Sequence, residues 1–125
     1  MEPLQIASKA TRPPETPLPR MGMQKWSNPE FLRDTVEKGG FEKENIILKK
    51  ASMYCTVPEL THFATMLWSF VGGTSEAGWL KSDEEHWDKA IEVIKEELRK
   101  TDGFQPLNDG KAKLKFVANI AIATR

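Results

Sequence analysis

His62 is the residue of this sequence best suited to acid–base chemistry. An imidazole titrates near neutral pH, and Glu59 precedes His62 by three positions, about one helical turn. A carboxylate at this spacing can orient the imidazole for proton transfer. The alternative is an ordinary half-exposed helix pair, which the same spacing also produces. His62 and Glu59 are therefore candidate catalytic residues, and a structural role stays open for both.

Cys55 is the only cysteine of the chain. It comes just before a predicted helix N-terminus, a place that favours the thiolate and hence nucleophilic attack. The alternative is a small buried hydrophobic residue, the commoner role of a free cysteine. One cysteine and two histidines exclude an internal disulfide and a zinc site with two thiolates, so we expect no metal.

Three helix starts position these side chains. Each places a hydroxyl residue three positions before a glutamate, the pattern of a capping box, at Ser27, Thr56 and Ser82. The segments that follow the first two of these starts end in glycine pairs, which is typical of helix C-termini. The sequence therefore predicts helices over residues 29–38, 58–70 and 83–100. The apolar residues expected in the core are Leu60, Phe63, Ala64, Leu67 and Val71 of the second helix, and Trp87, Ala90, Ile91, Ile94 and Leu98 of the third.

Two long strands complete the predicted elements, over residues 44–55 and 112–124, the second after the turn signal Asn108-Asp109-Gly110. The fold class is therefore α+β, with about three helices packed on a small antiparallel sheet. Two strands leave two open edges and a single hydrogen-bonded seam. We expect oligomerisation to complete this sheet.

The first 22 residues differ in composition from the rest. Five of the eight prolines fall within the first twenty positions, which favours an extended arm over a packed element. We interpret residues 1–22 as a proline-rich arm docked on a partner subunit, and residues 23–125 as one α+β domain. A floppy terminal segment is the alternative.

The overall composition limits the classes of partner. The chain has 125 residues, with 18 Lys and Arg against 18 Asp and Glu, so its formal net charge is zero. Without a dense basic cluster, nucleic acid and anionic membranes are not expected as ligands. No apolar stretch has the length of a signal peptide core or a membrane span. We expect a soluble cytoplasmic protein.

Several segments in order resemble one family. They are a capped helix ending GGF, the strand ENIILKKASMYC, the helix TVPELTHFATMLWSFVGG, the segment TSEAGWLKSDEEHWDKAIEVIKEEL and the strand KLKFVANIAIATR. Over residues 18–125 the chain resembles the C-terminal, substrate-side part of class I S-adenosylmethionine-dependent methyltransferases of the fungal small-molecule type. The family's glycine-rich GxGxG loop and following acidic residue are missing, so the resemblance implies no bound cofactor.

The resemblance implies that residues 56–73 cover an acceptor substrate. The side of this helix away from the core would then face the substrate, with Met66, Trp68, Ser69 and Phe70 beside His62. Tyr54, on the preceding strand, is a further candidate for a hydrogen bond to a ligand carbonyl, although a lone strand tyrosine is usually a packing residue. These five residues are the candidate substrate-binding residues.

Three hypotheses for function follow. The first is a truncated, methyltransferase-like protein that binds a small hydrophobic metabolite as a homodimer and catalyses a cofactor-independent step of specialised metabolism: cyclisation, isomerisation or proton transfer, not methylation. The second is a non-catalytic subunit that completes and regulates a methyltransferase by adding strands to its sheet. The third is a fragment without function.

Overall fold

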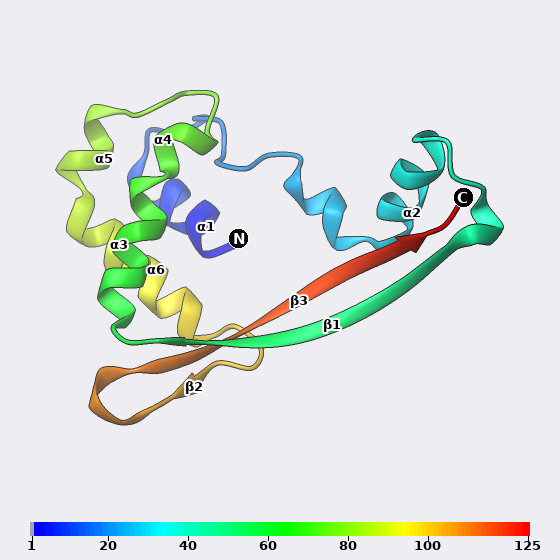
Figure 1. Ribbon diagram of the computed structural model, residues 1–125. Coiled ribbons are helices and arrows are strands. Elements are labelled where there is room, and N and C mark those ends of the chain that lie inside the picture. Colours follow the sequence, from blue (N-terminus) through cyan, green and yellow to red (C-terminus); the bar gives the residue numbers. More distant parts are fainter. Residues whose placement is uncertain (1) are drawn as a thin grey trace. The chain divides into compact units, whose positions relative to one another are not determined.

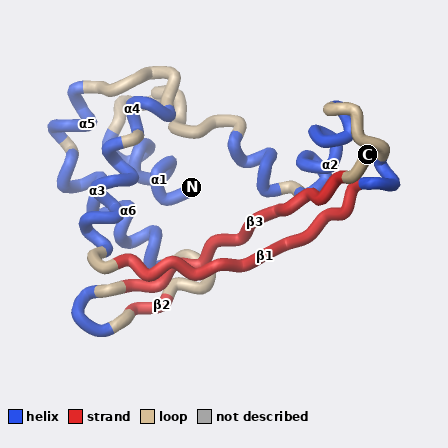
Figure 2. The backbone as a smooth tube through the Cα atoms, viewed as in Figure 1, coloured by secondary structure: helices blue, strands red, loops and turns tan. Residues whose placement is uncertain are grey.

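The computed structural model describes residues 2–125 and confirms an α+β fold (Figures 1 and 2). The helices are α1 (Glu2–Thr11), α2 (Pro29–Lys38), α3 (Leu60–Ser69), α4 (Val71–Thr74), α5 (Lys81–Glu85) and α6 (Trp87–Arg99). The strands are β1 (Ile46–Val57), β2 (Gln105–Pro106) and β3 (Ala112–Ala123). Short 3₁₀ helices span Met23–Ser27, Lys43–Asn45 and Asn108–Gly110.

The sheet is antiparallel with the strand order β1-β3-β2. Its two long strands run side by side, and both correspond to predicted strands, displaced by up to two residues (Figure 2). At the far end of β3, the Thr124 N–H donates to the Asn45 carbonyl at 3.2 Å. On its other side β3 pairs with only the two residues of β2, which place Gln105 opposite Lys113 and Pro106 opposite Ala112.

The chain divides into two compact units, each of which is described by itself. Unit 1 takes in residues 2–21 and Cys55–Leu114, and unit 2 takes in Gly22–Tyr54 and Lys115–Arg125. The strands β1 and β3 contribute residues to both units. The boundary after residue 22 that the sequence suggested remains a prediction.

Unit 1 has a continuous hydrophobic core, built where α1 and α3 pack against α6. The predicted stripe of α6 is confirmed, because Ala90, Ile91, Ile94 and Leu98 are all buried. The stripe predicted for the second helix is confirmed at Leu60, Ala64 and Val71, but Trp68, which was expected to face a substrate, is buried as well. The buried residues of α3 are Leu60, Ala64 and Trp68, and Phe63 and Leu67 are only partly buried.

The N-terminal segment is packed into unit 1, and the expectation of an extended arm was wrong for its first half. Residues 2–11 form α1, with Leu4 and Ala7 in the core. Pro3 falls in the first turn, where a missing N–H costs nothing. The prolines from Pro13 onward follow the helix and mark its end, because proline cannot continue a helix.

A buried ion pair fixes this segment. Arg12 meets Asp83 in a two-pronged contact, with Nε to Oδ1 at 2.8 Å and Nη2 to Oδ2 at 2.7 Å. The two side chains are 1% and 0% exposed. Arg12 also donates to the Ser75 hydroxyl and the Gly78 carbonyl, and Asp83 accepts the Leu80 N–H. Additional hydrogen bonds of this kind offset the cost of burying an ion pair.

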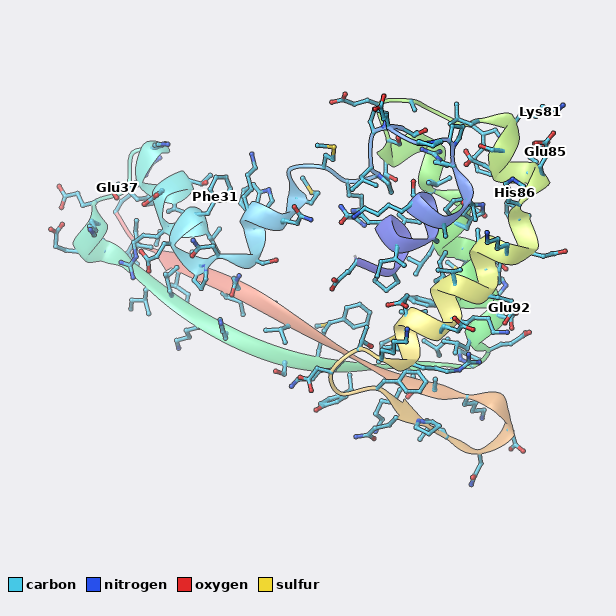
Figure 3. All side chains as sticks on the ribbon, turned by 180° about the vertical axis from the view of Figure 1, so that it is seen from behind. Phe31, Glu37, Lys81, Glu85, His86 and Glu92 are labelled. Atoms are coloured by element: carbon cyan, nitrogen blue, oxygen red, sulfur yellow. The ribbon has the colours of Figure 1, made fainter. Side chains whose placement is uncertain are left out.

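The third predicted helix is interrupted. It forms as α5 and α6, with His86 between them in a non-helical conformation (Figure 3). The expected cap at Ser82 is also displaced, because Asp83 accepts the Leu80 N–H and the helix starts at Lys81. On the surface of α5, Lys81 and Glu85 form an exposed ion pair of 3.1 Å.

Unit 2 is a two-stranded ribbon with α2 and the 3₁₀ helix Met23–Ser27. Helix α2 has the predicted bounds, but its cap is Asn28, whose side chain accepts the Glu30 N–H at 3.0 Å. Phe31 of α2 meets Trp26 edge-on, with ring centroids 4.8 Å apart. Asn119 of β3 donates to the Trp26 and Ser27 carbonyls, which ties the 3₁₀ helix to one face of the ribbon.

Little of unit 2 is buried. Within residues 22–54 and 115–125, all of which the structure describes, Ile46 is the single buried residue. A hollow of about 400 Å³ separates the helical segment from the ribbon, lined by Trp26, Ser27, Leu32, Lys50, Val117 and Asn119. The packing of this unit is therefore loose.

Candidate functional site

A groove of about 270 Å³ lies in unit 1, where the end of β1 turns through Pro58 into α3. Its lining residues are Cys55, Thr56, Val57, Pro58, Glu59, His62, Phe63 and Met66. The backbone is extended up to Glu59, with φ −147°, and becomes helical at Leu60. This sharp change of direction folds the strand end against the first two turns of α3 and so produces the groove.

The groove brings together three residues that the sequence proposed for the site. Glu59, His62 and Met66 all line it. His62 and Met66 lie four positions apart on one face of α3, and Glu59 is the residue that precedes its first turn. The Glu59 side chain makes no capping bond to α3, so its carboxylate is not used in the helix start. The two side chains proposed for acid–base chemistry therefore lie in one exposed groove.

The other four proposed residues lie outside this lining. Trp68 is fully buried in the core, where its indole N–H donates to the Asp83 carbonyl at 3.1 Å. Ser69 is exposed and donates its hydroxyl to Thr65 in its own helix. Phe70 ends α3 with 63% of its surface exposed, and Tyr54 is the last β1 residue of unit 2, 53% exposed. Burial of Trp68 leaves no surface on which a ligand could lie.

Five residues of the groove were not among the proposed site residues. They are Cys55, Thr56, Val57, Pro58 and Phe63. The sequence did single out Cys55 as a candidate nucleophile, and its thiol is exposed. Its Sγ lies 3.9 Å from the Thr56 carbonyl. The signal that could have found the other residues is the strand-to-helix transition at Pro58, since such turns bring a strand end close to a first helical turn.

The lining is mainly apolar, and it contains one carboxylate side chain, Glu59, and one imidazole, His62. Elsewhere, the pKa of Lys100 is raised because its ammonium donates to Glu97 at 2.8 Å and is attracted by that carboxylate. This exposed pair closes the end of α6 and is not part of the groove. Among residues 2–125, no three His, Cys, Asp or Glu side chains gather in a way that would hold a metal ion.

No protein-family model matches this chain, and no curated protein matches it. The methyltransferase resemblance therefore stays a prediction from the sequence. Within the described residues, every helix is too short or too polar to cross a membrane.

Proposed function

We propose that this chain binds a small apolar molecule in the groove between β1 and α3, and that His62 exchanges a proton with it. The observation that carries the proposal is the placement of His62, Glu59 and Met66 in one groove. An exposed imidazole at the edge of an apolar surface can act as acid or base on a molecule lying on that surface. Glu59 would orient the imidazole.

The groove limits the size and polarity of its ligand. Its volume of about 270 Å³ corresponds to roughly nine water molecules at ~30 Å³ each and falls just under the range usual for drug-sized ligands. The apolar side chains of the lining favour the binding of a neutral, mainly apolar molecule. They are those of Val57, Pro58, Phe63 and Met66. The reactions that fit are those that need shape and a proton carrier, namely isomerisation, cyclisation or proton transfer, and not methylation. Specialised metabolism is the setting that the sequence resemblance suggests, and the lack of an apolar stretch of signal-peptide length favours the cytoplasm.

Cys55 provides a built-in reporter of groove occupancy, because it is the only thiol and lies in the lining. Its reaction with Ellman's reagent would be followed with and without indole and p-cresol as probe molecules. Slower reaction in their presence is the expected result. Met66→Ala should weaken this protection several-fold, while Met53→Ala, an exposed methionine outside the groove, should leave it unchanged.

The role of His62 is tested with His86 as its matched control, since His86 is the only other histidine and lies outside the groove. Exchange of the C3–H of indole and the ortho C–H of p-cresol for deuterium, in which the ring carbon gains a deuteron and then loses its proton to a base, would be followed by NMR in D₂O. His62→Ala should abolish any exchange above the buffer rate, and His86→Ala should keep it. Equal rates for the two variants would overturn the assignment of His62.

The alternative function is that of a non-catalytic subunit that adds strands to a methyltransferase sheet. The open strand edges of β1 and β3 favour it, because strand addition is an efficient way to bind another sheet. Mixing the chain with a class I methyltransferase and measuring the mass by light scattering tests it. A complex of both proteins would support this function, and two separate species would contradict it.

A further inference from the structure

The outer edge of β3 over residues 117–123 has no neighbouring strand among the described residues. On one side β3 pairs with β1, and on the other side β2 reaches only Ala112 and Lys113. We call residues 117–123 on this second side the free edge. A row of unpaired backbone groups on a long strand is a template for pairing with another strand.

Two hydrogen bonds show which amides point to the free edge. The Thr124 N–H donates toward β1, whereas the Lys111 carbonyl accepts from Leu107 on the β2 side. Because backbone groups alternate in direction along a strand, even-numbered residues of β3 bond to β1 and odd-numbered residues point outward. The outward groups over the free edge are those of Val117, Asn119, Ala121 and Ala123.

The charge pattern distinguishes the two long strands. Residues 116–123 read FVANIAIA and contain no charged residue, no proline and no glycine. The outer edge of β1 carries Lys49 and Lys50 at its middle, where self-pairing would place like charges opposite one another. The free edge of β3 has no such barrier.

We propose that a second copy of this chain pairs antiparallel with the first along the free edge of β3. The joined sheet would have the order β1-β3-β3-β1. An uncharged strand is complementary to itself about a two-fold axis, and nothing in this segment selects a charged partner. The proposal does not depend on the groove in unit 1, because the free edge lies wholly in unit 2.

The side chains of β3 fit this pairing. Where antiparallel residues do not exchange hydrogen bonds, their side chains come closest. Across the free edge these are the even-numbered residues, and they include Phe116, Ile120 and Ile122, which are 44%, 39% and 43% exposed. A two-fold axis near Ile120 would bring each Ile120 against its own copy. The pairing thus covers apolar side chains that a single chain leaves open to water.

The contact is small, so the dimer should be of moderate affinity. Seven paired residues span about 24 Å at ~3.4 Å per residue, and so short a strand pair makes a smaller contact than the interfaces of tight complexes. Light scattering from about 10 to about 500 µM covers dissociation constants of this class. The mass is expected to rise with concentration from 14.2 kDa to twice that value. A monomer throughout this range would overturn the proposal.

Charge variants at the axis locate the contact. Ile120→Lys and Ile120→Glu should each give monomers, because like charges would face one another, and an equimolar mixture should form a heterodimer. Ile47→Lys is the matched control, since Ile47 is an exposed isoleucine on β1, and it should still dimerise. Loss of the dimer in Ile47→Lys, or no heterodimer from the mixture, would contradict pairing along β3.

A proline variant tests the same contact independently, so the proposal can still be tested if the charge variants do not fold. Ala121→Pro removes an N–H that points to the free edge and leaves the bonds to β1 intact, which is where proline is tolerated in strands. With unchanged circular dichroism, at least a tenfold weaker dimer is expected. A dimer of unchanged affinity would overturn the proposed edge.

Discussion

The two units of this chain differ in how much of their sequence is buried. Unit 1 has a core shared by four helices and both long strands, closed by the Arg12–Asp83 pair. Unit 2 has a similar share of apolar residues, but only Ile46 is buried, and Met53, Val117 and several neighbours on the ribbon are largely exposed.

The comparison indicates that secondary structure in this chain comes from local capping and strand pairing, whereas stability comes from apolar burial. Unit 2 has a well-capped helix and a regular strand pair joined by one hydrogen-bonded seam. A two-stranded ribbon is marginally stable at best in water, because stability comes from apolar burial. Unit 1 therefore should hold its own fold, whereas we propose that unit 2 gains apolar burial from a second copy.

The largest effect is expected from breaking the buried pair of unit 1. Arg12→Met leaves Asp83 charged, buried and unpaired, which should lower the free energy of unfolding by about 3–5 kcal/mol. Urea unfolding followed by tryptophan fluorescence measures this. The double variant Arg12→Met/Asp83→Leu should recover much of the loss. The exposed Lys81–Glu85 pair is the control, and Lys81→Met should cost less than about 1 kcal/mol.

Trp68→Phe should have the next largest effect. It removes volume from the centre of the core and leaves the Asp83 carbonyl without its indole donor, which together should cost about 1–3 kcal/mol. The control is Trp79→Phe, because Trp79 is 42% exposed. Equal losses at the two positions would contradict the burial of Trp68.

A smaller and local effect is expected in unit 2. Ile46→Ala should cost about 1 kcal/mol, below the usual range for a buried isoleucine, because the surroundings are loosely packed. Fluorine NMR of 5-fluorotryptophan-labelled protein separates the units, since Trp26 is in unit 2 and Trp68, Trp79 and Trp87 are in unit 1. Only the Trp26 signal should change. Shifts at Trp68 of similar size would show that the two units unfold as one.

Local patterns predicted the elements more reliably than their inward faces. The bounds of α2 followed from Pro29 and the glycine pair, both signals within the segment itself. Helix α3 has apolar residues on two faces, so its periodicity placed Phe63 in the core and missed the burial of Trp68. The Arg12–Asp83 contact joins residues 71 positions apart and has no local signal, so the packed N-terminal helix was missed.

For the candidate site, the sequence predicted the residues that the helix contributes but not those that the strand end contributes. Helical spacing alone placed Glu59, His62 and Met66 on one face, and the structure puts all three in one groove. The contribution of the strand end depends on the turn at Pro58, whose direction is fixed by the packing of Val57 and Leu60 in the core. No pattern within the helix contains that information.

The smallest effect is expected from exposed apolar residues of the ribbon. Ile122→Thr keeps a β-branched side chain at a 43% exposed position, so monomer stability should change by less than about 0.5 kcal/mol. The dimer should weaken several-fold, because a cross-strand apolar contact is lost. Chemical denaturation at low protein concentration and light scattering at high concentration measure the two quantities separately. A destabilised monomer would show that Ile122 is buried within a single chain.

Hydrogen exchange of individual amides at two protein concentrations tests the contrast between the units most directly. At low concentration, amides of α6 should be strongly protected and those of unit 2 weakly protected. At high concentration, the amides of Val117, Asn119, Ala121 and Ala123 should gain protection selectively, because only their N–H groups point to the free edge. Equal protection of both units in the monomer, or no gain at these four amides on dimerisation, would contradict the account.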